Sequence, residues 1–440
     1  MSTGFERDPD FARGARAVIA LPDLGAQSLR NVEARLDEAA GLAEAIGIEV
    51  VEKRHFRIRS PRPATLFGTG QTEAIAEAVA GHEAELLIVD AAITPIQQKN
   101  LETAAKAKVI DRTGLILEIF GERAATAEGR LQVELAHLDY QAGRLVRSWT
   151  HLERQRGGFG FLGGPGETQI EADRRLIRDR MAKLRRELDQ VTRTRSLHRA
   201  RRQRAPWPVI ALVGYTNAGK STLFNRLTKA EVLAEDLLFA TLDPTMREIE
   251  LPGFDKAILS DTVGFISELP TQLVAAFRAT LEEVISADLI VHVRDVSHPD
   301  SEAQRADVEQ VLAEIGIRQA EGEEGGAPMI EAWNKVDLLD GEGLDRVRAE
   351  GERRDNIVLI SALAGQGVDN LLECASRQLR KGSDVRTVRL SLGEGDTIAW
   401  LHANGEVLGQ RFECEGEAEI DVRLSAADWA RFEGRRASRS

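Results

Sequence analysis

The sequence predicts an α/β protein of several domains. Two long regions, 15–125 and 209–380, alternate short apolar runs with helical patterns, which indicates parallel sheets covered by helices. At 440 residues, the chain is also too long for one ordinary hydrophobic core. We therefore expect four parts: an N-terminal parallel α/β domain at 1–125, an antiparallel helical hairpin at 126–206, a second α/β domain with a mixed, mostly parallel sheet at 207–382, and a small α+β domain at 383–440.

Composition narrows the class of protein. Hydrophobic residues make up 42% and charged residues 29%, as in globular proteins. No run of eighteen apolar residues is present, so no membrane span is expected. The first residues, MSTGFERDPDFARGARAV, lack an apolar segment and do not resemble a signal peptide. Cys374 and Cys414 have no metal-ligand spacing, and a disulfide framework is not expected from two cysteines, which fits a reducing cytoplasm. The expected location is the cytoplasm, including the periphery of the membrane, and we expect a monomer.

Charge is distributed unevenly. The net charge is −13, yet residues 141–205 hold 17 Arg and Lys against 7 Asp and Glu, so the rest of the chain carries −23. This basic stretch is a candidate for contact with a polyanion such as RNA. A solvated helix face would show the same pattern, and the charge alone does not separate the two interpretations.

The first α/β region has a regular order of elements. Apolar runs predict strands at 18–21, 49–58, 86–90 and 108–111, and amphipathic patterns predict helices at 29–46, 71–80 and after Thr94. No catalytic constellation is found in this region. We interpret Gly68–Gly70 as a loop turn rather than a phosphate cradle.

Two heptad seams predict a pair of long helices. The first seam is Leu131, Leu135, Leu138, Ala142, Leu145 and Trp149, and the second is Ile177, Met181, Leu184, Leu188 and Val191. Thr168 followed by Glu171 has the capping-box pattern and predicts the start of the second helix. From 168 to 204 that helix would be about 55 Å long at 1.5 Å per residue.

A glycine-rich tip joins the two helices. Residues 157–166 contain six glycines in ten, which disfavours helix. Its apolar side chains would either insert into a partner or fold back on the helices as a plug, and the arginines beside the tip favour the partner. The candidate contacts for such a partner, with phosphates or bases to bind, are Gly157, Phe159, Phe161, Leu162, Arg174, Arg175 and Arg178.

The strongest motif is a phosphate loop. The buried strand expected at 209–213 leads directly into Gly214-x4-Gly219-Lys220-Ser221 and a helix at 222–227. In this context glycines let backbone N–H groups turn inward, and the helix N-terminus favours an anion. Lys220 would reach the β- and γ-phosphates, and the Ser221 hydroxyl would ligate Mg²⁺.

Further motifs make the expected nucleotide GTP. Asp261 would hold Mg²⁺ through water, the Gly264 N–H would sense the γ-phosphate, and Thr241 would complete the metal shell, with Thr245 as a rival. The Asp337 carboxylate can accept hydrogen bonds from guanine N1 and N2, which adenine cannot offer. The segment Ser361-Ala-Leu363, after an apolar run at 357–360, fits a backbone contact to guanine O6. The full nucleotide-binding set is Gly214, Tyr215, Thr216, Asn217, Ala218, Gly219, Lys220, Ser221, Thr222, Thr241, Asp261, Gly264, Asn334, Lys335, Asp337, Ser361, Ala362 and Leu363, with Lys220, Thr241 and Gly264 as the catalytic residues.

These motifs resemble one family. GYTNAGKSTLFN, FATLDPT, DTVGFI and GGFGFLGGPGETQIEADRR are similar to the HflX family of translation-factor-related P-loop GTPases. The resemblance covers nearly the whole chain. It implies a GTPase domain at 207–382, binding to the large ribosomal subunit with the tip near the peptidyl transferase centre, and splitting of stalled or idle ribosomes under stress. It leaves open ATP use by the N-terminal domain, where no Walker motif is found.

Two positions bear on hydrolysis. Phe265 stands where Ras-like enzymes place a water-orienting glutamine, so slow intrinsic hydrolysis is expected. Asn217 would ligate K⁺, as in potassium-activated relatives, or would merely cap the turn. The leading hypothesis is a GTP-hydrolysing ribosome-splitting factor. The alternative is a GTP-gated RNA-binding or ribosome-assembly module in which hydrolysis only resets binding.

Overall fold

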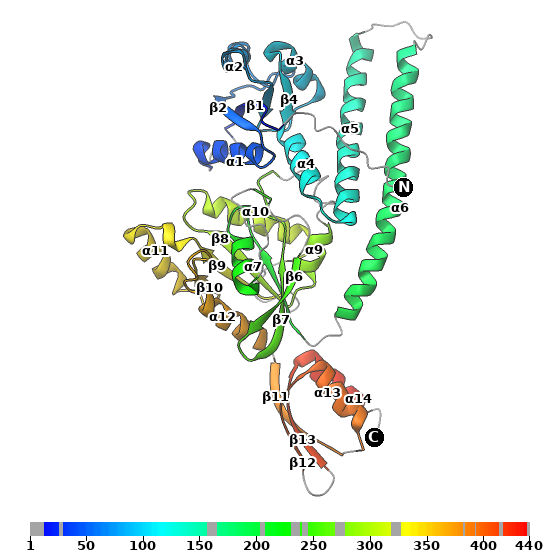
Figure 1. The fold of residues 1–440 in the computed structure, drawn as a ribbon, viewed down its shortest axis with the longest axis vertical. Helices are drawn as coiled ribbons and strands as arrows, with labels where there is room; N and C mark the ends of the chain where they lie inside the picture. The colour runs from blue at the N-terminus through cyan, green and yellow to red at the C-terminus, as the bar shows by residue number, and fades with distance from the viewer. Residues whose placement is uncertain are drawn as a thin grey trace.

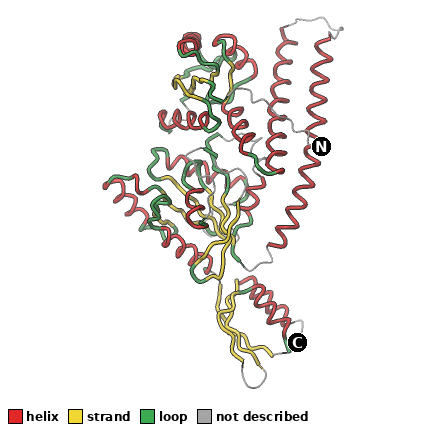
Figure 2. The backbone as a smooth tube through the Cα atoms, viewed as in Figure 1, coloured by secondary structure: helices red, strands yellow, loops and turns green. Residues whose placement is uncertain are grey.

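The computed structural model confirms the mixed α/β class. It describes residues 13–437 apart from 26–29, 156–164, 203–206, 230–237, 240–244, 269–277, 318–326, 382, 392 and 413–416. Figure 1 shows four successive parts: an α/β domain, a long helical hairpin, a second α/β domain and a small terminal sheet with two helices. Figure 2 separates the helices, strands and loops of the same view. Among the described residues, none of the helices is both long and apolar enough to cross a membrane.

The N-terminal domain is a parallel sheet with helices on both faces. Its strand order is β2-β1-β3-β4. Alternate residues of β1 enter opposite cores, with Ala17 and Ile19 on the side of α1 and α4 and Val18 and Ala20 on the side of α2 and α3. Its elements are β1 (Arg16–Asp23), α1 (Val32–Glu44), β2 (Glu49–Arg57), α2 (Thr69–Gly81), β3 (Leu86–Val89), α3 (Pro95–Ala105), β4 (Lys108–Asp111) and α4 (Arg112–Arg123).

Two expectations for this domain need correction. The first helix begins three residues later than predicted, because the Asn31 side chain caps it by accepting from the N–H groups of Glu33 and Ala34. Gly68 does not form a loop turn with Gly70. It is the N-cap of α2, and Gly70 lies inside that helix.

The hairpin consists of α5 (Ala127–Gln155) and α6 (Pro165–Arg202). The two helices lie side by side along one side of the N-terminal domain, with α5 in contact with α3 and α4 (Figure 1). The second helix starts at Pro165, three residues before the predicted Thr168, since proline suits the first turn of a helix. At 38 residues α6 is about 57 Å long at 1.5 Å per residue.

Among the seam residues whose side chains the structure describes, only some are buried. On α6, Met181 and Leu184 are buried as expected. On α5, the predicted Leu131 and Leu135 are half-buried, whereas Val133 and Ala136 are buried in the core that also contains α4. The heptad pattern missed this second face because it describes only contacts between the two hairpin helices.

The second α/β domain has a six-stranded sheet in the order β10-β9-β8-β5-β7-β6. Only β6 is antiparallel to its neighbour, so the sheet is mixed and mostly parallel as predicted. Its elements are β5 (Val209–Val213), α7 (Lys220–Thr228), β6 (Thr245–Leu251), β7 (Phe254–Asp261), α9 (Arg278–Ile285), β8 (Leu289–Asp295), α10 (Ser301–Glu314), β9 (Met329–Asn334), η1 (Val336–Leu338), α11 (Gly341–Gly351), β10 (Ile357–Leu359) and α12 (Val368–Arg380).

The C-terminal domain is a three-stranded antiparallel sheet, order β11-β13-β12, with two helices. Strand-like runs at 388–392 and 420–424 with one helical pattern predict two strands and one helix, so the structure has one strand and one helix more. Its elements are β11 (Ser383–Ser391), α13 (Gly395–Asn404), β12 (Glu406–Phe412), β13 (Glu417–Ser425) and α14 (Ala426–Ala437). Cys374 is buried on α12, and Cys414 lies outside the described residues.

The two α/β domains share one hydrophobic core. A single buried cluster contains Ile19 and Phe120 from the N-terminal domain together with Phe239 and Val263 from the second domain. The rings of Phe120 and Phe239 meet edge to face, with centroids 4.7 Å apart. Continuous apolar packing of this kind holds the two sheets in a defined relation to each other.

Candidate nucleotide site

The phosphate loop has the predicted strand–loop–helix context. It lies between β5 and α7, and two of its glycines are required by close approach. A Cβ on Gly214 would lie 2.2 Å from the Val293 carbonyl oxygen, and one on Gly219, at φ +93°, would lie 2.2 Å from the Asn334 Nδ2. The loop can therefore keep this shape only with glycine at both positions.

Lys220 is held inside this loop. Its ammonium donates to the carbonyl oxygens of Gly214, at 3.0 Å, and Tyr215, at 2.7 Å. Burial lowers the pKa of Lys220 to about 8, against the opposing effect of the Asp261 carboxylate. A phosphate group placed in this loop would restore the preference for the charged form, which fits the predicted role of this residue.

Ser221 and Asp261 meet where Mg²⁺ is expected. The Ser221 hydroxyl donates to Asp261 Oδ2 at 3.0 Å, from the first turn of α7 to the end of β7. A hydroxyl and a carboxylate are hard oxygen ligands of the type that Mg²⁺ takes alongside phosphate oxygens. The donor set therefore fits the predicted metal. Thr241 lies outside the described residues, and its rival Thr245 begins β6, paired with Asp261 in the sheet.

The segment after Asp261 is bonded to the phosphate loop. The Thr216 N–H donates to the Phe265 carbonyl at 2.7 Å, and the Phe265 N–H donates to the Gly214 carbonyl at 3.1 Å. A Cβ on Gly264 would lie 2.9 Å from the Thr216 Cα and 3.2 Å from the Lys220 Nζ. Gly264 thus lies close to Thr216 and Lys220 of the phosphate loop. The Phe265 side chain is buried in the shared core.

The base-recognition motifs converge on the same loop. Asn334 connects the phosphate loop with the segment 361–363. Its Nδ2 donates to the Ala218 carbonyl and its Oδ1 accepts from the Ala362 N–H, both at 2.8 Å. The Lys335 ammonium pairs with Asp295 at 2.8 Å. Asp337 is exposed, so its carboxylate is accessible to a base.

The remaining predicted positions differ in exposure. Asn217 is exposed with φ +56°, a left-handed conformation that asparagine tolerates well, so its backbone gives it a reason to be there apart from any cation. Ser361 is fully buried and its hydroxyl accepts from the Ala364 N–H, while Leu363 is exposed and Thr222 is half-buried on α7.

Two features of the site were missed from the sequence. Arg226 of α7 donates to the carbonyl oxygens of Ala362, at 2.6 Å, and Leu363, so it holds the loop that would contact guanine O6. The Tyr215 side chain leaves the phosphate loop altogether and donates to Glu38 of the N-terminal domain. No local pattern signals either contact, because each partner lies more than 130 residues away.

The predicted RNA contacts are described only in part. Gly157, Phe159, Phe161 and Leu162 lie outside the described residues. On α6, Arg175 and Arg178 are exposed and Arg174 is half-buried. Arg180, a further arginine of the basic stretch, instead pairs with Glu134 of α5 at 2.7 Å.

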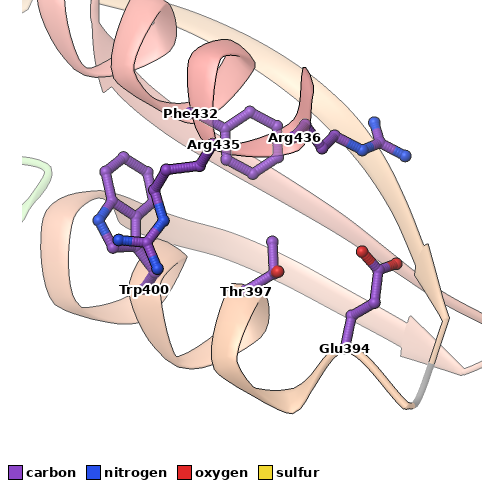
Figure 3. A pocket seen from close by; sticks show the side chains of 6 residues that line it. All are labelled: Glu394, Thr397, Trp400, Phe432, Arg435 and Arg436. Atoms are coloured by element: carbon purple, nitrogen blue, oxygen red, sulfur yellow. The ribbon is translucent and has the colours of Figure 1, made fainter. Parts of the chain in front are cut away.

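A small pocket lies apart from this site, in the C-terminal domain. Figure 3 shows its lining side chains, with the Arg435 guanidinium beside the Trp400 indole. The Trp400 and Phe432 rings stack with centroids 5.9 Å apart, and Arg435 lies 5.7 Å from the Trp400 ring centre. These contacts pack α13 against α14, and no predicted site residue lines the pocket.

Four family models match the chain. In chain order they are described as GTP-binding GTPase N-terminal (33–121), GTP-binding GTPase middle region (123–202), 50S ribosome-binding GTPase (209–335) and HflX C-terminal domain (340–439). The middle-region match contains most of the hairpin, and the third match contains the phosphate loop.

Curated relatives match over nearly their whole length. GTPase HflX of Magnetococcus marinus is 50% identical over 400 residues, 91% of this chain and 90% of the relative. GTPase HflX of Escherichia coli is 42% identical, covering 90% of this chain and 91% of the relative. The protein of the same name from Caldanaerobacter subterraneus subsp. tengcongensis is 42% identical, over 89% of each chain.

Proposed function

The chain belongs to the HflX family of GTPases, and we propose that it couples GTP hydrolysis to binding of the large ribosomal subunit and to splitting of stalled or idle ribosomes under stress. As a GTPase it converts GTP to GDP and phosphate. The proposal places it in the cytoplasm as a monomer. Its proposed domains end at residues 125, 206, 382 and 440.

The hairpin is the observation that carries this proposal. Two helices of 29 and 38 residues lie side by side, and the end of α5 and the start of α6 lie at the same end of the hairpin, away from the second α/β domain (Figure 1). Exposed arginines such as Arg175 and Arg178 suit contacts with RNA phosphates. The description of the matching GTPase model as ribosome-binding supports the same partner.

In the proposed cycle, GTP state controls the loops around the γ-phosphate. Lys220 would bind the β- and γ-phosphates, and the Gly264 N–H and Thr241 would respond to the γ-phosphate. Ser221, and Asp261 through water, would hold Mg²⁺, which would supply positive charge to offset that of the phosphates. Loss of the γ-phosphate would release these segments and weaken binding to the ribosome.

Phe265 makes the ribosome the natural activator. A buried phenylalanine cannot hydrogen-bond to water, so orientation of the attacking water would depend on the docked partner. We expect single-turnover hydrolysis to be at least about tenfold faster with large subunits present, a small part of the range known for partner-activated GTPases. Equal rates with and without ribosomes would contradict this role.

Splitting can be distinguished from binding alone. Addition of protein and GTP to intact ribosomes should lower light scattering, and GDP should not. Replacing Arg175 and Arg178 by Glu should abolish the scattering change while intrinsic hydrolysis stays unchanged, with Arg59→Glu, an exposed arginine off the hairpin, as control. Binding to isolated large subunits without any loss of scattering would favour the alternative, a GTP-gated RNA-binding or assembly module.

K⁺ near Asn217 is a separate proposal for the same site. If Asn217 ligates K⁺, hydrolysis should be faster in K⁺ than in Na⁺ at equal ionic strength. Asn217→Ala should then remove the difference. If Asn217 serves only the turn, the two salts should give equal rates in the parent protein.

A further inference from the structure

A four-residue cluster connects the phosphate loop to the N-terminal domain. We call Glu38, Arg112, Tyr215 and Ser267 the interdomain clamp. The Tyr215 hydroxyl donates to Glu38 Oε2 and accepts from the Ser267 N–H at 2.8 Å. The Ser267 hydroxyl donates to Glu38 Oε1 at 3.0 Å. One carboxylate of the N-terminal domain thus binds both the phosphate loop and the segment that follows Gly264.

Arg112 completes the clamp from the first turn of α4. Its Nη2 donates to Glu38 and to the carbonyl and hydroxyl oxygens of Ser267, at 3.1 and 2.8 Å. Its Nη1 donates to Asp90, just after β3, at 2.5 Å. Burial would raise the pKa of Glu38, but the Arg112 charge and the hydrogen bonds keep it below the ordinary value. The carboxylate is therefore ionised and fixed from both sides.

The clamp closes a short rigid path to the mouth of the site. Ser267 follows Gly264 closely in the chain, and Phe265 between them is bonded to the loop through both its N–H and its carbonyl. Tyr215, the other end of the path, is itself part of the loop. Gly264 is therefore restrained at a fixed distance from Lys220 by side chains that belong to another domain.

We propose that Glu38 and Arg112 are positioning residues for GTP, which hold Gly264 ready to bind the γ-phosphate. The inference rests on the proposed role of the Gly264 N–H. A site ordered before binding loses less conformational entropy when the ligand arrives. GDP has no γ-phosphate and gains nothing from this order. The N-terminal domain therefore increases the preference for GTP over GDP.

Other contacts keep the domains together when the clamp is altered. The Asn31 N–H donates to Asp300 at 2.9 Å, Arg30 pairs with Asp307, and Phe120 packs on Phe239. A conservative change such as Glu38→Gln leaves all of these in place. Its effect should therefore appear at the site rather than as separation of the domains.

The test compares two ligands in the full-length protein. Fluorescent GDP and a non-hydrolysable GTP analogue are titrated into the parent, Glu38→Gln, Ser267→Ala and the control Asp37→Asn. Asp37 neighbours Glu38 on α1 but pairs with Lys53 at the surface. We expect Glu38→Gln to weaken the GTP analogue by about tenfold, a common size for coupling between sites, and GDP by less than about twofold. Ser267→Ala should also weaken the GTP analogue more than GDP, but by a smaller factor than Glu38→Gln. Asp37→Asn should change neither affinity.

Equal weakening of both ligands by Glu38→Gln, or no change in either, would overturn the positioning role. Ser267→Ala alters the clamp from the GTPase side and tests the same role if Glu38→Gln does not fold. Failure of the parent protein to bind GDP would instead refute the proposed nucleotide site.

Discussion

Lys220 is the residue through which pH acts most directly on the phosphate loop. Its pKa is lowered to about 8 by burial, so a growing fraction of the free protein carries a neutral amine above that value. Phosphate binding needs the charged form and must then take up a proton. We expect GDP affinity to fall by about tenfold between pH 7 and pH 9, measured by fluorescence titration.

The control for this pH effect is Lys220→Arg, whose guanidinium stays charged throughout. Its GDP affinity should be nearly independent of pH, and a fall parallel to the parent protein would contradict the assignment.

The effect of pH on folding stability through Lys220 has the opposite sign to its effect on GDP affinity. Between pH 8 and 10.5 the unfolded chain binds more protons at this position than the folded one, so the contribution of Lys220 to stability rises with pH.

Arg226 is expected to affect the affinity for guanine nucleotides through the segment 361–363, which is predicted to contact guanine O6. Arg226→Ala removes two hydrogen bonds to the carbonyls of Ala362 and Leu363, each contributing on the order of 0.5 to 1.5 kcal/mol. GDP should bind at least about fivefold more weakly in equilibrium titration. A diphosphate of 2-aminopurine riboside lacks O6, so its affinity should change little, and Arg346→Ala, on an exposed position of α11, should change neither. Equal loss for both nucleotides would show that Arg226 supports the fold only.

At the scale of elements, Asp111 joins β4, α4 and the middle of α5 in the hairpin. Its buried carboxylate caps α4 by accepting from the Gly114 N–H at 2.8 Å. It also accepts from the Tyr140 hydroxyl at 2.6 Å and from Arg144 at 2.7 Å, both on α5. One side chain of the sheet therefore anchors α5 by two hydrogen bonds, in addition to its apolar packing.

Asp111→Ala should loosen this junction. Buried donors on two elements would lose their acceptor, which costs about 2 to 4 kcal/mol of unfolding free energy. Urea denaturation would measure the loss, and hydrogen exchange should show faster exchange around Tyr140 and Arg144 of α5. Asp139→Ala, at an exposed position of the same helix, is the control. An unchanged midpoint in the Asp111 variant would mean that apolar packing alone holds the hairpin.

At the scale of the whole molecule, the shared core predicts that nucleotide binding stabilises both α/β domains. Their apolar residues form one cluster, and the interdomain clamp ties that cluster to the phosphate loop. At a hundredfold excess of GDP over its Kd, stability should rise by about 2.7 kcal/mol. Hydrogen exchange should slow in β1 as well as in β5. Protection confined to residues 209–335 would show that the domains behave independently.

Much of this molecule follows from local sequence. The βαβ alternation predicts seven elements of the N-terminal domain, because strand and helix periodicities are properties of neighbouring residues. The phosphate loop is equally local, since strand, glycines, lysine and helix follow one another in a single stretch. The order of the guanine motifs and the long hairpin are also readable in this way.

The tertiary structure alone decided the contacts between distant segments. In the folded protein the Tyr215 hydroxyl donates to Glu38, and Arg226 donates to the Ala362 carbonyl. Val133 is buried rather than the predicted Leu131. None of these has a local signal, because each depends on which surfaces meet when two sheets and a hairpin pack together. The sequence by itself determined a guanine-nucleotide site beside a basic helical hairpin. The packing of the N-terminal domain decided which side chains restrain that site.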